Sequence, residues 1–192
     1  LTKERNDLKR DIEQRFPAYA ELVDPKPVTL ASVQSTLLTG ETMISIYAGE
    51  DATFVWAVPK QGAPLFTSAP VSGEQLSKIV DKLRKALDPQ ATSVEEIPDF
   101  DVATAAKLYT DLLKPVEPAW KGSSKHLLVV PHGALGQLPF GLLPTADVTL
   151  AKSGDTFAEY KQVPWLIRET ALTQLPSVTA LAALRRTPAP RG

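Results

Sequence analysis

The chain has 192 residues, 43% of them hydrophobic and 22% charged, which is the composition of a globular domain that can bury one sizeable core. Its 21 basic and 22 acidic residues leave a net charge of −1, so no overall positive field favours binding to nucleic acid or to an anionic membrane. The sequence contains no cysteine, which excludes disulfides, cysteine-ligated metals and a thiol nucleophile from this chain.

Residues 1–16 carry an apolar stripe at helical spacing, formed by Leu8, Ile12 and Phe16 among charged residues. The spacing predicts a helix that ends or kinks at Pro17. This helix either packs on the domain that follows or is the last helix of an upstream helical-repeat array. No period near 34 residues recurs in the chain, so any such repeats would precede it.

The two ends of the sequence predict that the chain is part of a longer protein, and its hydropathy predicts where that protein is located. It starts at Leu1 inside the helical pattern, and residues 187–192 (TPAPRG) have the composition of a linker, so we expect a piece of a longer protein. No apolar stretch is long enough to cross a membrane, and the first 15 residues are too charged for a signal peptide. We therefore expect a soluble protein located in the cytoplasm.

A short helix and a β-hairpin are predicted next. Thr29 can cap a helix that carries Leu30, Val33 and Leu37 on one side, with Gly40 as its left-handed C-cap. Residues 42–48 (TMISIYA) and 53–58 (TFVWAV) are rich in β-branched and aromatic side chains and predict two strands joined by a turn at 49–51. A third strand is predicted at 65–67.

Two amphipathic helices follow. Ser72 and Gln75 fit a capping box that starts a helix with a long apolar stripe, which stops at Asp88 and Pro89. Residues 88–98 are polar and bracketed by prolines, which predicts a loop. A second helix is predicted from Phe100 to Leu113.

The last part of the chain predicts strands of a layered domain. Residues 126–131 (HLLVVP) form an unbroken apolar run, so we expect 127–130 to be a central strand buried on both faces. A loop at 131–145 follows, then a strand within 165–175 and a helix at 178–186 capped by Ser177. Together these elements favour an α/β layered domain preceded by a hairpin.

Residues 127–144 (LLVVPHGALGQLPFGLLP) resemble the most recognisable stretch of CHAT domains, the caspase-like cysteine peptidase domains found beside TPR repeats. The resemblance continues in Trp165-Leu166-Ile167, similar to a strand of that family, and in Leu175-Pro176-Ser177, similar to its following helix start. Phe16-Pro17, Thr39-Gly40-Glu41 and Phe54-Val55-Trp56 are similar to the family's lead-in.

This resemblance implies the fold class α/β, with an N-terminal helix and a β-hairpin leading into a partial caspase-like three-layer α/β/α sheet. Residues 1–40 would be a helical lead-in, with the end of a TPR array as one interpretation of it. Residues 41–192 would be the N-terminal part of a CHAT domain, truncated before its catalytic half. The implied partners are upstream TPR repeats, the C-terminal half of the domain and, through the full-length protein, a protein or peptide substrate.

A caspase-like peptidase needs a cysteine thiolate, a neighbouring histidine and backbone donors for the oxyanion. In the family these groups come from a later His-Gly motif and a strand ending in a Ser-Ala-Cys type motif, and neither occurs here. We therefore expect this chain to contribute no catalytic, cofactor-binding or metal-binding residue. A part of a bacterial cysteine endopeptidase is the first hypothesis. A non-catalytic caspase-like interaction module is the second, and a phosphate-binding domain, for which the Gly-rich loop is missing, is the third.

The two histidines, His126 and His132, are the most obvious candidates for catalytic residues. His132 follows the central strand where open α/β sheets build sites, but the related family position is commonly Asp and is not the catalytic histidine. His126 begins the strand, so it is expected to face solvent at the amino end. The loop after the strand is interpreted as architecture, with Gly133 and Gly136 permitting unusual backbone angles.

Other candidate groups have simpler interpretations. Glu95 and Glu96 lie in a loop and are expected to be solvated, and Arg185 and Arg186 suit the C-terminus of a helix. No phosphate loop, G-x-S-x-G, H-E-x-x-H or calcium-loop motif occurs in the sequence. The tryptophans at positions 56, 120 and 165 are scattered, so no platform for stacking bases is predicted.

Overall fold

The structure is a computed structural model that describes residues 15, 28–150 and 157–186. The predicted helix at 1–16, apart from Arg15, and the linker-like residues 187–192 lie outside the described residues. The helices are α3 (Leu30–Thr36), α4 (Gly73–Leu87), α5 (Val102–Leu112) and α6 (Val178–Arg186), and the strands are β1 (Glu41–Ala48), β2 (Thr53–Pro59), β3 (Leu65–Ala69), β4 (His126–Val130) and β5 (Ala171–Gln174).

The described strands form one mixed five-stranded sheet in the order β3-β2-β1-β4-β5. β1, β2 and β3 are antiparallel, whereas β4 is parallel to β1 and β5 is parallel to β4. The α/β fold class is confirmed. The predicted hairpin of β1 and β2 leads into β4 and β5 along the chain and is itself part of the sheet, with β1 as the middle of the five described strands.

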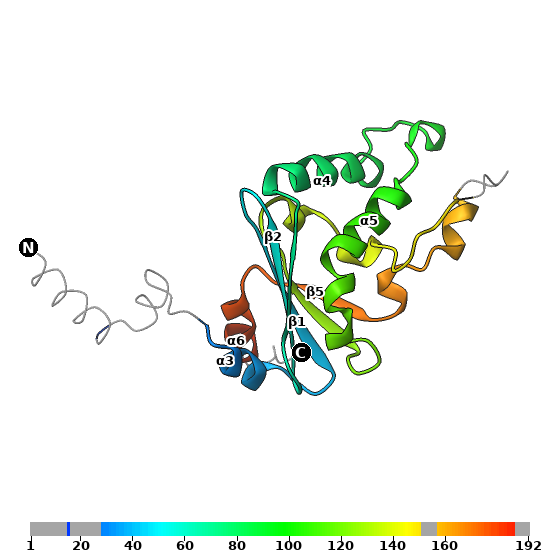
Figure 1. Ribbon diagram of the computed structural model, residues 1–192. Helices are drawn as coiled ribbons and strands as arrows, with labels where there is room; N and C mark the ends of the chain where they lie inside the picture. Colours follow the sequence, from blue (N-terminus) through cyan, green and yellow to red (C-terminus); the bar gives the residue numbers. More distant parts are fainter. Residues whose placement is uncertain (1–14, 16–27, 151–156, 187–192) are drawn as a thin grey trace, which may run out of the picture.

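Strand β4 confirms the prediction of a central strand buried on both faces. Its side chains alternate between two separate clusters, as the period of a strand requires. Leu127 and Val129 join one core cluster, and Leu128 and Val130 join the other. In Figure 1, α4 and α5 lie on one side of the sheet, here called the first face, and α3 and α6 lie on the other, the second face.

The first face carries the larger core. Its cluster holds 23 buried residues, drawn from the strands, from α4 and α5, and from the irregular segments around them. The stripe of α4 supplies Leu76, Val80 and Leu83, as its spacing predicted. At the end of α5, the Tyr109 hydroxyl donates to Glu117 Oε1 at 3.0 Å, and burial together with this carboxylate raises the pKa of Tyr109.

The second face carries a smaller core of eight buried residues, gathered under α3 and α6. Val33 and Leu37, which precede β1, pack there together with Leu181 of α6. An ion pair between Arg185 and Glu41, with Nη2 and Oε2 2.5 Å apart, ties the end of α6 to the start of β1. Arg185 also donates to the Thr36 carbonyl at the end of α3.

The predicted helix caps are largely confirmed. The Ser72 side chain accepts from the N–H of Gln75, whose own side chain accepts from the N–H of Ser72, so the capping box of α4 is complete. Thr29 caps α3, and the Ser177 hydroxyl accepts from the N–H of Ala180 at 3.1 Å. Gly40 is not the C-cap of α3, because the helix already ends at Leu37 and Gly40 takes a φ of +81° in the turn that follows.

The prediction of a strand within 165–175 is only partly right, because β5 covers just Ala171–Gln174. Residues Leu166–Arg168 form a short 3-10 turn, so the match of 165–167 to a family strand is wrong in structure. The physical reason is that Leu166 is buried in the core of the first face and its N–H donates to the Leu143 carbonyl at 2.9 Å. This segment is therefore held to the loop after β4 and not to β4 itself.

Candidate functional site

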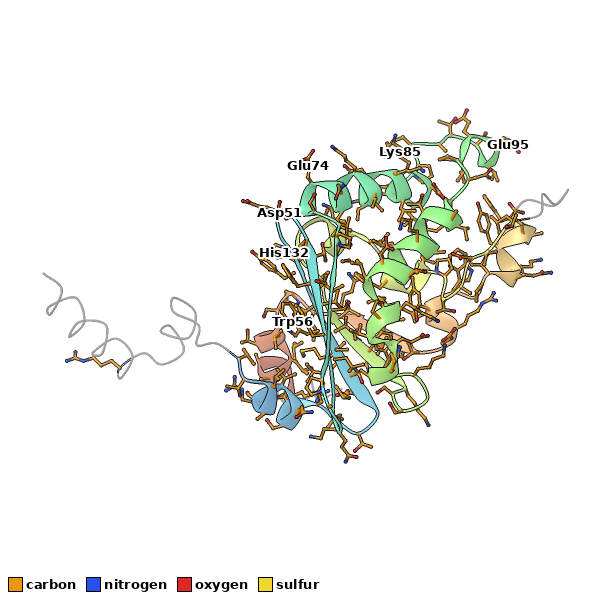
Figure 2. The ribbon with its side chains drawn as sticks, in the orientation of Figure 1. Asp51, Trp56, Glu74, Lys85, Glu95 and His132 are labelled. Carbon is orange, nitrogen blue, oxygen red and sulfur yellow. The ribbon has the colours of Figure 1, made fainter. Side chains whose placement is uncertain are left out.

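The carboxyl ends of β1 and β4 lie side by side, because the two strands are parallel neighbours. Two loops leave the sheet there, residues 49–52 after β1 and residues 131–139 after β4. Sites of open α/β sheets form at such ends. The His132 ring packs on the Tyr47 ring with centroids 4.7 Å apart, which links the loop after β4 to the end of β1. In Figure 2, His132 lies near this end of the sheet, below Asp51 and Glu74.

The loop after β4 is anchored to the sheet by buried side chains. Leu135, Leu138 and Phe140 are each at most 1% exposed and belong to the core of the first face. Gln137 accepts a hydrogen bond from Arg84 of α4. Gly133 takes a φ of +59°, as expected, but Gly136 has no positive φ, so the same expectation for Gly136 is wrong. The burial of Leu135, which precedes Gly136, fixes an ordinary 3-10 turn here.

An open pocket of about 390 Å³ lies at the turn after β1, beside Tyr47. The turn is closed by the Gly49 N–H, which donates to the Ala52 carbonyl at 2.9 Å, and the Gly73 N–H donates to Gly49 at 2.8 Å. Glu50 and Glu74 line the pocket. The hydrogen bond from Lys78 lowers the pKa of Glu74, and the two side chains form an ion pair at 2.7 Å at the rim of this pocket.

The two histidines lie at opposite ends of β4 and are not brought together. His132 is exposed and, among the described residues, no acid or base is hydrogen-bonded to its ring; its contact is the Tyr47 ring. The arrangement offers neither a nucleophile nor a paired base at this position. Within the described ranges, no cluster of three or more metal-binding side chains occurs.

His126 is less isolated than the sequence predicted. It lies at the amino end of β4, as expected, but its Nε2 is 2.8 Å from Thr173 Oγ1 on β5, and its Nδ1 is 3.9 Å from Glu41 Oε1. Burial alone would raise the pKa of Glu41, but hydrogen bonds from Arg185 and from the Leu38 N–H outweigh it and lower that pKa overall. This cluster joins β1, β4, β5 and α6 and is structural.

The remaining candidates stay apart. Glu95 and Glu96 are exposed in a 3-10 turn, where Glu96 accepts from the Thr92 N–H at 2.9 Å. Arg186 donates to the Ala182 carbonyl at 3.2 Å near the end of α6, as expected of a cation there, whereas Arg185 pairs with Glu41. The three tryptophans do not meet: Trp120 is buried in the core of the first face and Trp165 packs on Phe100 and Tyr160.

Sequence reasoning missed a strip of aromatic side chains on the second face. Phe66 of β3, Phe54 and Trp56 of β2, and Tyr47 of β1 lead across the sheet to His132, and we call these five residues the aromatic strip. Neighbouring ring centroids are 5.1 Å apart for Trp56 and Phe66, 6.3 Å for Phe54 and Phe66, and 6.5 Å for Tyr47 and Phe54. The signal was present, because Phe54 and Trp56 alternate with the buried Val55 and Ala57.

The fold is thus that of an α/β protein whose mixed sheet ends in two loops at the carboxyl ends of β1 and β4. Residues 102–192 match the family model of the CHAT domain. The range starts with α5 and includes β4, its loop, β5 and α6, so the recognition of this family from the sequence is confirmed there. No curated protein matches the chain. Through the described part of the chain, no helix has both the length and the apolarity needed to cross a membrane.

Proposed function

We propose that this chain is the N-terminal, structural part of a CHAT-type caspase-like cysteine endopeptidase. It supplies the first strands and helices of the peptidase domain, and a second segment of the domain supplies the histidine and the cysteine. The match of residues 102–192 to the CHAT domain supports this assignment. Upstream TPR repeats, a bacterial source and a cytoplasmic location belong to the same proposal.

The observation that carries the proposal is the open edge at β5. Among the described residues, β5 pairs with β4 and with no other strand, and three of its four residues are exposed. The Ala171 N–H donates to Lys125 and the Leu175 N–H donates to Val129, both toward β4. Because N–H groups alternate along a strand, those of Leu172 and Gln174 point to the open edge. A further strand could pair there.

The chemistry agrees with this division of the domain. The chain has no cysteine, so the thiolate must come from elsewhere. Within the part of the chain that the structure describes, the exposed His132 contacts the Tyr47 ring and no acid or base. What the chain can offer is a supported sheet edge and rigid loops at the carboxyl ends of the parallel strands. Positioning of a site by such a scaffold is the contribution that the geometry supports best.

The test combines this chain with a separately produced CHAT segment that carries the His-Gly and Ser-Ala-Cys motifs. The chain alone should hydrolyse no peptide in a mixed peptide library, and the pair should bind and restore hydrolysis. Gln174→Pro should weaken the pairing at least about tenfold, because proline removes an outward N–H while leaving the bonds to β4 intact. Gln174→Ala, which keeps the N–H, is the matched control and should bind normally.

Two results would overturn the proposal. One is hydrolysis by the chain alone, since that would require chemistry within a chain that has no thiol. The other is binding of the second segment that Gln174→Pro leaves unchanged, since the open edge of β5 would then play no part in assembling the domain.

A further inference from the structure

Among the described residues, the second face is covered only at the end where α3 and α6 lie. α3 and α6 lie over Met43, Val58 and Leu128, which are at most 4% exposed. Farther along the same face, Tyr47 is 52% exposed and Phe66 is 57% exposed. Figure 2 shows Trp56 and His132 on the side of the sheet where α3 and α6 lie, beyond the ends of those helices. The aromatic strip is therefore the uncovered part of a face that is otherwise packed by helices.

The size and chemistry of the strip suit one short amphipathic helix. The strip crosses three interstrand spacings, which is about 15 Å. The apolar stripe of residues 1–16 runs from Leu8 to Phe16, which is about 12 Å in a helix. Three apolar side chains at that spacing can each meet a ring of the strip, and helices pack on sheets in this way.

The connection to the rest of the chain permits this contact. α3 begins at Leu30 and lies on the second face, so the described part of the chain starts on that face. Residues 17–29 can span at most about 45 Å when extended. Strand β1 has eight residues and is about 27 Å long, so the tether reaches from α3 to the strip with length to spare.

The charges beside the aromatic strip are opposite in sign to those beside the apolar stripe of residues 1–16. Glu50 and Asp51 are exposed at the turn next to Tyr47. On a helical projection of residues 1–16, Arg5 and Lys9 lie in or beside the apolar stripe, on the surface that would face the strip. Cations next to aromatic rings and carboxylates gain from both contacts.

We propose that residues 1–16 form a helix that packs on the aromatic strip and completes the second face of the sheet. The contact is within one chain. A tether of this length holds the helix at a local concentration in the millimolar range, which favours the intramolecular contact over association with a second copy. This inference goes beyond the proposed function and does not depend on it.

The test exploits the absence of cysteine from the chain. In the full chain, a single Ile12→Cys carries a bimane label, whose emission is quenched by contact with tryptophan. Arg10→Cys, on the opposite side of the predicted helix, carries the label as the matched control. We expect quenching at position 12 but not at position 10. Trp56→Phe should abolish the quenching, since it keeps an aromatic ring in β2 but removes the quencher.

A second variant separates a lost contact from a lost fold. Leu8→Ser with Phe16→Ser removes the rest of the stripe without touching the sheet, so it should also abolish the quenching while far-ultraviolet circular dichroism of the sheet persists. Equal emission at positions 12 and 10, insensitive to Trp56→Phe, would overturn the proposal. Quenching that fades on dilution or on mixing with excess unlabelled chain would overturn it too, and would make a second copy the occupant.

Discussion

The two faces of the sheet use alternate residues of the same strands but are covered by different amounts of chain. On the first face, α4, α5 and the turns around them bury 23 residues in one cluster. On the second face, α3 and α6 bury eight residues near one end, and the aromatic strip is left at the other. Strand pattern alone does not distinguish these faces, because both carry large apolar side chains.

The difference shows that stability and recognition can be separated within one sheet. A complete core resists unfolding, whereas exposed rings at the end of a sheet gain free energy only when something packs on them. We expect substitutions on the first face to act mainly on the free energy of unfolding. Substitutions at the covered end of the second face should lower the free energy of unfolding only where they remove a specific contact, such as the ion pair between Arg185 and Glu41.

The largest expected effect tests the packing of the first face. Leu83→Ala in α4 should lower the free energy of unfolding by about 2–5 kcal/mol, because Leu83 is fully buried and its truncation leaves a cavity in the core of the first face. Leu184→Ala in α6 is the matched control. Its side chain is 60% exposed, so the change should stay within about 0.5 kcal/mol. Urea unfolding measures both, and equal losses would contradict the place of Leu83 in the core of the first face.

An intermediate effect is expected where α6 is tied to β1. Arg185→Gln should lower the free energy of unfolding by about 1–3 kcal/mol, because Glu41, whose side chain is only 10% exposed, loses its charged partner. Arg186→Gln is the control, since Arg186 is exposed and, among the described residues, hydrogen-bonds the Ala182 carbonyl of its own helix. Hydrogen exchange should speed up in α6 for the first variant alone. Equal exchange in both variants would mean that the ion pair does not anchor α6.

The smallest effect depends on pH and concerns the joint between α4 and α5. The hydrogen bond from Lys82 lowers the pKa of Asp101 to about 2, with Thr104 adding to it against burial. A lowered pKa stabilises the fold above the ordinary pKa of the group, and this contribution is lost as the pH falls toward 2. Asp101→Asn keeps an N-cap but not the charge. Between pH 4 and pH 2, the free energy of unfolding of the wild type should therefore fall by about 1 kcal/mol more than that of the variant. Urea unfolding at each pH measures this, and parallel plots of the free energy of unfolding against pH would contradict it.

Elements with local signals could be predicted from the sequence. The capping box of Ser72 and Gln75 lies within four residues, so it fixes the start of α4 without knowledge of the rest of the fold. The apolar run of β4 likewise predicted burial on both faces, because none of Leu127 to Val130 is polar. The motif around that strand also led to the CHAT family, which matches over residues 102–192.

Features that depend on distant pairings could not be predicted. Arg185 meets Glu41 across 144 positions of the sequence, and no spacing rule connects them. Trp165 to Ile167 have the composition of a strand, but the contact of Leu166 with the loop after β4 prevails. The aromatic strip needs the register of three strands at once, which places Trp56 opposite Phe66 and Phe54 opposite Tyr47.

The connectivity of the sheet also bears on the order in which its strands can come together. β1 and β2 meet across the short turn at Gly49–Ala52, whereas pairing of Glu41 with His126 must close a loop that contains β2, β3, α4 and α5. Loop-closure entropy grows with the logarithm of loop length, so the parallel pairing costs about 2–3 kcal/mol more to initiate. The antiparallel meander therefore has the lower entropic barrier, and β4 can join it only once burial of Leu127 to Val130 offsets the closure of the longer loop.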